Sequence, residues 1–277
     1  MTTNHATHAN LHNNRVVARL TAARAERRIA LMPFICAGHP SIESTSNTLL
    51  ALDRAGADVI EIGIPFSDPI ADGPVIAGAM HEAIQRGVTW QACFEQVHQA
   101  RQQALAAAVV AMVSMSIVLR VGIERFTRAA ADAGIDGLII PDTPLEEAPI
   151  ASAAAHNVGL INALLVAPTT PIDRARQIAA ASSGFVYVVA RAGVTGDNAN
   201  PDLDTLDERL QALRTVTDLP LAVGFGIAKR EHVQVLESRA DAAIVGSALV
   251  RVMAAAADPA NAAADLLTSL RPASATA

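Results

Sequence analysis

The amino-acid sequence predicts an α/β fold, a (β/α)8 TIM barrel with an extra N-terminal helix. Eight short apolar runs recur along the chain, and each is followed by turn residues and a helical pattern. The runs do not alternate apolar with polar residues, which is typical of parallel strands covered on both faces. The length of 277 residues also suits a single barrel, which takes about 250 residues.

The eight runs are the predicted strands. In chain order they are IALMPFIC (29–36), VIEIGIP (59–65), AVVAMVSM (108–115), GLIIP (137–141), GLINALLV (159–166), FVYVVA (185–190), LAVGFG (221–226) and AAIVGS (242–247). A weak repeat supports the series, because AGADVIEIG, AGIDGLIIP and SRADAAIVG each place a small residue and an aspartate before a strand. A doubly wound sheet is disfavoured, since CAGHPS after the first strand lacks the glycine-rich dinucleotide fingerprint.

Helices are expected between the strands. Residues 15–28 form an amphipathic pattern that is expected to cover the lower face of the barrel. Residues 123–133 and 171–181 show apolar residues at helical spacing with arginines on the other face. One more helix is expected beyond Ala254.

No linker rich in proline and serine divides the chain, so we predict one domain over residues 15–271. A disordered N-terminal tail is expected over residues 1–14 and a frayed C-terminal tail over residues 272–277. The histidines of the N-terminal tail are not expected to bind metal, and no metal site is predicted.

Composition excludes several classes of protein. The net charge of −6 comes without a basic run and aromatic residues make up 3%, so we exclude a nucleic-acid binder. No apolar stretch is long enough for a membrane span. The N-terminus lacks a signal-peptide core and two cysteines are too few for a disulfide framework, so a cytoplasmic protein is expected. The only lysine, Lys229, lies beyond a strand end, which disfavours a Schiff-base aldolase.

Two carboxylates are the first candidates for chemistry, because active sites of such barrels lie at the C-terminal ends of the strands. Glu61 lies within the second strand, and it faces the interior if Ile60 and Ile62 face the helices. Burial would raise its pKa and suit it to acid and base roles near neutral pH. Asp72, in the loop DPIADGP, is close enough in sequence to reach the same substrate. A structural glutamate paired with an arginine and a solvated turn aspartate stay open as alternatives.

Glycines after the last three strands indicate a phosphate site. GVTG (193–196), GFG (224–226) and GS (246–247) follow the sixth, seventh and eighth strands. Glycine N–H groups and a helix N-terminus bind anions, and in barrels phosphate binds at the loops after the seventh and eighth strands.

Several motifs together resemble one family. IEIGIPFSDPIADGPVI is the most specific, and MPFICAGHP, PDTPLEE, LLVAPTTP, ARAGVTG, GFGI and IVGSALV support it. On these motifs the chain resembles the tryptophan synthase alpha subunit from about residue 22 to residue 253. The resemblance implies a lyase of tryptophan biosynthesis that cleaves indole-3-glycerol phosphate into indole and glyceraldehyde 3-phosphate.

The resemblance also implies roles for single residues. Glu61 matches the catalytic glutamate, which protonates the indole ring at C3 and takes the proton of the glycerol hydroxyl. Asp72 matches the aspartate that stabilises positive charge on the indole nitrogen. Phe34 and Tyr187 match aromatic residues of the pocket.

Further matches concern the phosphate and the partner. The loop that closes over the substrate contains Arg191 and Thr195. The phosphate cradle matches Gly196, Gly226, Gly246 and Ser247. No metal or organic cofactor is implied for this chain, because pyridoxal phosphate belongs to a beta subunit. The two subunits are expected to form an alpha2-beta2 heterotetramer through the loops that carry Asp68 and Thr195.

The chain also departs from the family pattern. Ser114, Met115 and Ser116 replace an aromatic pair and an asparagine, which thins the wall around the ring. Cys36 and His39 replace a threonine and an aspartate; Cys36 is expected to be a small buried residue rather than a nucleophile, and His39 to be solvated. Two other functions therefore stay open: a regulatory subunit that binds a phosphate ligand without catalysis, and a phosphosugar lyase or isomerase with another substrate.

Overall fold

The computed structural model describes residues 11, 13–69, 72–190, 203–224 and 226–271. Their strands form one nine-stranded sheet in the order β5-β4-β3-β2-β1-β9-β8-β7-β6, and every pair is parallel. The strands are β1 (Ala30–Cys36), β2 (Val59–Gly63), β3 (Ala108–Met112), β4 (Gly137–Ile139), β5 (Ile161–Ala163), β6 (Leu165–Val166), β7 (Val186–Val189), β8 (Leu221–Gly224) and β9 (Ala242–Val245).

The predicted (β/α)8 barrel is confirmed, with one change in the fifth strand. Its run breaks at Leu164 into β5, which pairs with β4, and β6, which pairs with β7. The two pieces together occupy the place of one strand, so nine short strands still make a nearly closed barrel of eight positions.

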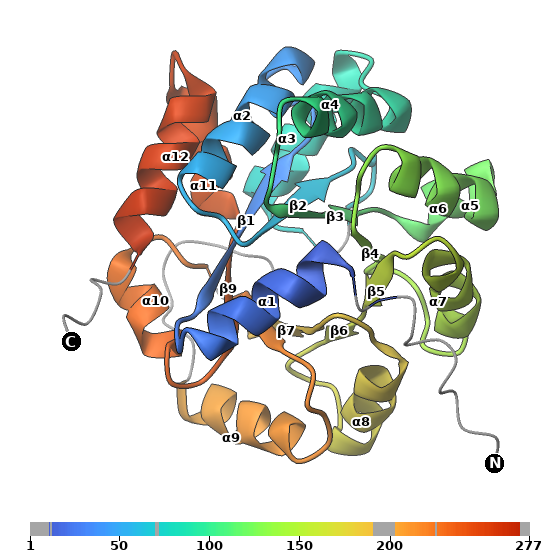
Figure 1. Cartoon of the computed structure of the whole chain (residues 1–277), viewed down its shortest axis with the longest axis vertical. Coiled ribbons are helices and arrows are strands. Elements are labelled where there is room, and N and C mark those ends of the chain that lie inside the picture. Colours follow the sequence, from blue (N-terminus) through green and yellow to red (C-terminus); the bar gives the residue numbers. More distant parts are fainter. Residues whose placement is uncertain (1–10, 12, 70–71, 191–202, 225, 272–277) are drawn as a thin grey trace.

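Helices surround the sheet (Figure 1). The described residues contain α1 (Arg15–Ala25), α2 (Ile42–Arg54), α3 (Pro74–Gln85), α4 (Trp90–Gln102), α5 (Met115–Val121), α6 (Ile123–Asp132), α7 (Ala148–Asn157), α8 (Ile172–Ala181), α9 (Leu203–Arg214), α10 (Arg230–Leu236), α11 (Ser247–Ala255) and α12 (Pro259–Leu270). There are more than eight because α1 precedes the barrel and two helices follow each of β2, β3 and β9. In the part of the chain that is described, none of them has the length and apolar character to span a membrane.

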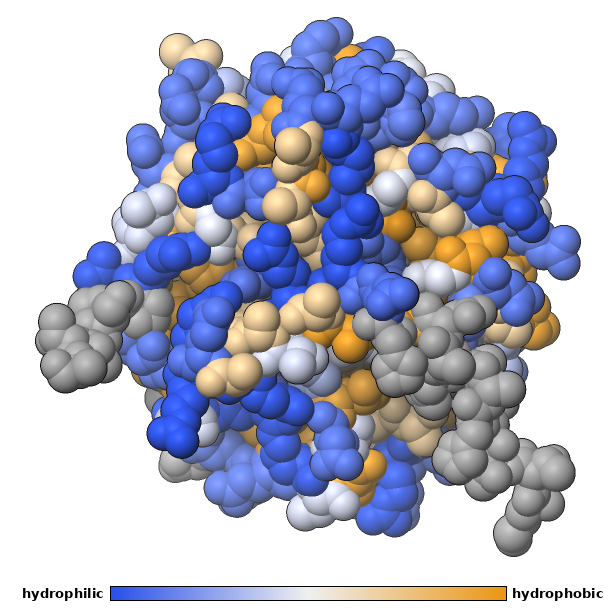
Figure 2. All heavy atoms as spheres, in the orientation of Figure 1, coloured by the Kyte–Doolittle hydropathy of each residue, from blue (hydrophilic) through white to orange (hydrophobic). Residues whose placement is uncertain are grey.

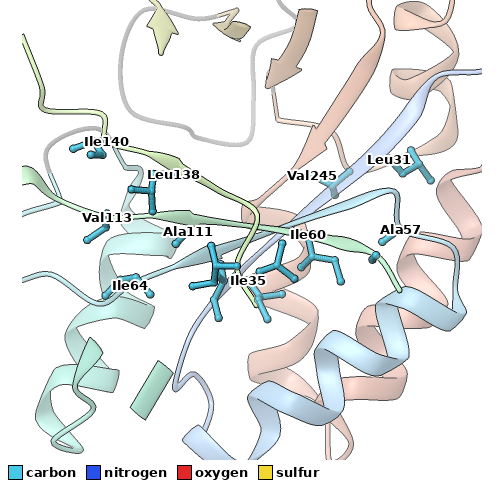
Figure 3. Packing of buried hydrophobic residues seen from close by; sticks show 14 of the residues in the cluster. Leu31, Ile35, Ala57, Ile60, Ile64, Ala111, Val113, Leu138, Ile140 and Val245 are labelled. Carbon is cyan, nitrogen blue, oxygen red and sulfur yellow. The ribbon is translucent and has the colours of Figure 1, made fainter. Parts of the chain in front are cut away.

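Side chains of the strands alternate between two hydrophobic layers. Ile35, Ile60 and Leu138 point outward and pack under the helices (Figure 3). Met32 and Val110 point into the barrel. Since each fully buried aliphatic side chain contributes about 1.5–3 kcal/mol, both layers hold the strands in a single register, and a shift by one residue would exchange them.

Helix α1 closes the N-terminal end of the barrel. It crosses in front of the strands in Figure 1. Its Val16 and Leu20 belong to the same hydrophobic cluster as Met32 and Val110, which point into the barrel. Asn14 caps the helix and donates from Nδ2 to the carbonyl oxygens of Asp136 at 2.7 Å and Gly159 at 2.9 Å. Leu11 is also buried, so packing extends into the segment expected to be a tail.

Hydrophilic residues cover most of the face seen in Figure 2.

The repeated aspartates explain the internal repeat of the sequence. Asp58, Asp136 and Asp241 each precede a strand and accept a backbone N–H of the strand before it. The donors are Leu31 at 3.0 Å, Val109 at 2.8 Å and Leu221 at 2.7 Å, respectively. The same carboxylates pair with Arg28 at 2.8 Å, Arg101 at 2.7 Å and Arg24 at 3.0 Å. Each aspartate thereby sets the register between two neighbouring segments.

We expect Asp136→Ala to lower the free energy of unfolding by about 3 kcal/mol or more, because it leaves the largely buried Arg101 guanidinium without its partner. Urea denaturation followed by circular dichroism measures this. Asp173→Ala is the matched control, since its side chain is 87% exposed and lies 3.9 Å from Arg176; it should change stability by no more than about 0.5 kcal/mol. Equal losses in both variants would contradict the role of Asp136.

Candidate active site

Glu61 lies on the inner side of β2, surrounded by the barrel. Its neighbours Ile60 and Ile62 belong to the outer hydrophobic layer, so alternation turns the carboxyl group inward. The residue is fully buried, and neither carboxyl oxygen has a hydrogen-bond partner within the described residues. Burial, with a further contribution from the negative charge of Asp72, raises the pKa of Glu61 to about 8. Glu61 is therefore not paired with any arginine in the described part of the chain, as the alternative interpretation of a structural glutamate would require.

Asp72 lies at the end of the loop between β2 and α3. It is half-buried, and its backbone N–H donates to the carbonyl oxygen of Pro69 at 3.0 Å. Burial raises the pKa of Asp72 to about 6. Because its charge raises the pKa of Glu61, the two carboxyl groups belong to one electrostatic site.

Tyr187 extends this site from β7. A Cβ atom on Gly224 of the neighbouring strand would lie 3.5 Å from the Tyr187 hydroxyl oxygen, so the side chain extends to Gly224 on β8. Burial, followed by the charges of Glu61 and Asp72, raises the pKa of Tyr187 well above its usual range. The phenol therefore stays protonated and can donate a hydrogen bond.

Phe34 lies beside Glu61, because the register of β1 and β2 places the two residues opposite each other. Its ring packs over Gly63, where an added Cβ would meet the ring at 2.6 Å and Met80 at 3.2 Å. Any larger residue at position 63 would displace the ring of Phe34. Gly63 thus leaves room for the apolar side chains of Phe34 and Met80.

A cavity opens beside Asp72 and Met80. Its walls are mostly apolar, and its polar lining groups are three aspartates and one serine. The lining residues are Ile64, Phe66, Asp68, Pro69, Asp72, Met80, Met112, Val113, Ser114, Pro141 and Asp142. Asp72 opens into this cavity, whereas Glu61 lies beneath it and is sealed from solvent. An aromatic ring with one hydrogen-bonding edge suits such a space.

Sequence reasoning missed Asp142 and Phe66 as lining residues. Asp142 follows the predicted strand 137–141 directly, so the rule that polar residues after strands line the site would have identified it. Phe66 carried no such signal, because its place depends on the path of the loop that follows β2.

The predicted phosphate residues lie around the ends of β8 and β9. Gly226 adopts a φ of +84°, a backbone conformation that favours glycine. Gly246 caps α11, and an added Cβ there would lie 3.6 Å from Ile76 and 4.0 Å from Phe34. Ser247 is buried as the first residue of α11. The contact of Gly246 with Phe34 places the C-terminal end of β9 next to the residue that lies beside Glu61. Three further predicted residues, Arg191, Thr195 and Gly196, lie outside the described residues.

The two substituted residues of the first loop are both buried. Burial is the main cause that raises the pKa of the Cys36 thiol, so it stays protonated and is a poor nucleophile. The expectation that His39 is solvated was wrong, because only 5% of the residue is exposed. Its ring nitrogen Nδ1 lies 3.5 Å from Glu82, and burial lowers its pKa. The loop folds down onto α3, which the sequence did not indicate. Within the described residues, no group of three or more metal-ligating side chains comes together.

Comparison with known proteins supplies the family. The model of the family described as tryptophan synthase alpha chain matches residues 20–276. The chain belongs to this family. The alpha chain of Thermosynechococcus vestitus is 45% identical over 258 residues, which cover 93% of this chain and 96% of that protein. The alpha chain of a Synechococcus strain is 46% identical over 243 residues, covering 87% and 89%.

Solved structures of the family share the fold. Tryptophan synthase of Mycobacterium tuberculosis superposes with a TM-score of 0.85 at 33% identity, covering 93% of this chain and 96% of that chain. A mutant alpha subunit from Pyrococcus furiosus gives a TM-score of 0.80 at 34% identity, covering 87% and 97%.

Membership of the tryptophan synthase alpha family confirms the predicted activity at the level of the family. It is a family of lyases that cleave indole-3-glycerol phosphate in tryptophan biosynthesis, and neither alternative function is favoured. Its members form complexes with a beta subunit, to which pyridoxal phosphate belongs. The roles of single residues remain predictions.

We expect the stability of the protein to depend on the protonation of Glu61. The folded pKa of about 8 exceeds the ordinary value of 4.5, so the folded state holds the proton between these values. The free energy of unfolding should therefore fall as the pH rises from about 4.5 to about 8. Glu61→Gln cannot ionise and should flatten this fall, as measured by urea denaturation at several pH values. Asp72 titrates in both proteins and cancels in the comparison. Equal slopes would show that Glu61 ionises normally.

Proposed function

We propose that this chain cleaves indole-3-glycerol phosphate with Glu61 as its proton-transferring residue and Asp72 as its charge-stabilising residue. One observation carries the proposal: Glu61 is turned into the barrel, fully buried and without a hydrogen-bond partner in the described residues, with Asp72 and Tyr187 in its electrostatic range. A buried acid with no structural partner is costly to keep and is typical of a catalytic group.

The raised pKa of Glu61 defines the first step. With a pKa of about 8 the carboxyl group is mostly protonated near neutral pH, so it can donate its proton to C3 of the indole ring. Protonation places positive charge on the ring nitrogen. The carboxylate of Asp72 accepts the N–H and stabilises that charge.

The second step breaks the carbon–carbon bond. Glu61, now a carboxylate, takes the proton of the glycerol hydroxyl, and the carbon–oxygen bond becomes the carbonyl of glyceraldehyde 3-phosphate. The electron pair of the broken bond returns to the ring and restores aromatic indole. One group thus serves as acid and then as base, which requires a pKa near the working pH.

The remaining residues position the substrate. Phe34 and Tyr187 flank Glu61 and would pack on the ring and the glycerol chain. Gly246 and Ser247 at the start of α11, together with Gly226 after β8, would bind the phosphate through backbone N–H groups. Met80 is a flexible side chain over Gly63, so it can move to admit the substrate to Glu61.

Beyond the reaction, we propose that the chain uses no metal or organic cofactor of its own and acts in the cytoplasm. A carboxyl group that exchanges protons with carbon and oxygen is sufficient for both steps. Arg191, Thr195 and Gly196 keep their predicted roles in the closing loop and the phosphate cradle, which the family resemblance supports.

We expect Glu61→Gln to lower indole release by at least about a thousandfold, because the amide cannot transfer a proton. Asp72→Asn should lower it by about a hundredfold while leaving substrate binding nearly intact. The measurement is indole release from indole-3-glycerol phosphate by the isolated chain and again with added beta subunit. If Glu61→Gln kept its rate in both assays, the assigned mechanism would be wrong.

We propose that exposed apolar residues on three helices form the docking surface for the beta subunit. In the described part of the chain, Leu119, Ile150 and Ile172 are large hydrophobic side chains with 57%, 64% and 43% of their surface exposed. Leu119 lies on α5, whereas Ile150 and Ile172 lie in the first turns of α7 and α8, which follow the C-terminal ends of β4 and β6. This side also carries Asp68, which lines the cavity mouth.

We expect the double variant Leu119→Glu with Ile150→Glu to weaken binding of the beta subunit by at least about tenfold, because two charges would enter an apolar contact. Isothermal titration calorimetry with purified beta subunit measures this. Ala22→Glu on α1, at the opposite end of the barrel, is the matched control for added charge and should bind normally. Unchanged binding of the double variant would place the interface elsewhere.

A further inference from the structure

Ser114 and Asp142 form a hydrogen-bonded pair on the wall of the cavity that contains Asp72. We infer, on the basis of the proposed function, that this pair determines substrate specificity by binding a hydroxyl group on the benzene ring of the indole. The chain would then accept ring-hydroxylated indole-3-glycerol phosphates in addition to the unsubstituted compound.

The backbone positions of Ser114 and Asp142 are fixed by two paired strands. Ser114 follows β3 and Asp142 follows β4, and these two strands are paired. The ladder continues beyond the strands, where the Val113 N–H donates to the carbonyl oxygen of Ile139 at 3.0 Å. Because both residues leave adjacent strands immediately, their side chains have little freedom to separate.

The carboxylate of Asp142 is held by two donors. The Ser114 hydroxyl donates to one oxygen at 2.6 Å, and the backbone N–H of Met115 donates to the other at 2.8 Å. Each oxygen accepts one hydrogen bond in this arrangement and keeps a further lone pair. Both Ser114 and Asp142 are half-buried and line the cavity, so a donor on a bound ligand can reach this carboxylate.

The other residues that line the cavity determine which kind of ligand can bring a hydrogen-bond donor to Asp142. Phe66, Met80 and Met112 supply apolar walls that suit a flat aromatic ring. Asp72 is assigned to the ring nitrogen, which leaves Asp142 for a different edge of the ring. Asp68 also lines the cavity, but it is exposed and remains solvated.

A hydroxyl and a methyl group of similar size therefore behave differently here. A ring hydroxyl donates to the anchored carboxylate, whereas a methyl group removes water from it and returns no hydrogen bond. A hydrogen bond to a charged acceptor changes selectivity by roughly tenfold or more.

The test uses the reverse reaction, condensation of indoles with glyceraldehyde 3-phosphate, followed by chromatography. Hydroxyindoles and methylindoles substituted at each benzene-ring carbon are compared by kcat/KM. The parent should prefer the hydroxyindole at one ring position at least, and Asp142→Asn should lower the hydroxyl-to-methyl ratio there by roughly tenfold. Comparing the ratio between proteins cancels the intrinsic reactivity of each indole and any general loss of activity.

Two further variants separate specificity from structure. Ser114→Leu should also lower the ratio, because it removes the hydroxyl and fills the space with apolar atoms. Ser116→Ala is the matched control: Ser116 is exposed and outside the cavity lining, and its ratio should equal that of the parent. A ratio that stays the same in Asp142→Asn and Ser114→Leu would overturn this inference while leaving the proposed function intact. No condensation of unsubstituted indole by the parent would instead refute the proposed function.

Discussion

Strand register is the constraint on which the site depends. Phe34 lies beside Glu61 because β1 and β2 pair with these residues opposite each other, and a shift of one residue would turn Glu61 toward the helices. Asp58 sets that register from below by accepting the Leu31 N–H and pairing with Arg28. A carboxylate at the N-terminal end of the barrel therefore controls the position of another nearer the C-terminal end.

Burial of Glu61 has opposite effects on stability and on chemistry. An ionised carboxylate without partners would cost too much in this interior, so the group holds its proton instead. The same shift gives a carboxylic acid that can protonate carbon near neutral pH. Gly63 leaves room for Phe34 and Met80, which pack against β2 two residues beyond the acid. The stability lost by burying an acid is thus tied to the reactivity gained.

The sequence was sufficient to predict where the strands lie and that Glu61 faces the barrel interior, because both depend on local patterns. Buried parallel strands are continuous apolar runs, and catalytic groups follow them at known places. The break at Leu164 was not foreseeable, since apolar residues continue on both sides of it, at Ala163 and Leu165. Burial of His39 was missed because it depends on α3, which is distant in sequence. The repeated aspartates were visible, but their acceptor role requires knowing which strands are neighbours.

Carboxyl groups at the two ends of the barrel differ in whether an arginine lies beside them. At the N-terminal end, Asp58, Asp136 and Asp241 each pair with an arginine and accept a backbone N–H, and they serve structure. Toward the C-terminal end, Glu61 and Asp72 have no ion-pair partner among the described residues, and burial raises the pKa of both. Residues of one chemical type thus become structural or reactive according to whether the fold supplies a cation. Without a cation beside it, Glu61 keeps its proton near neutral pH, which the proposed mechanism requires.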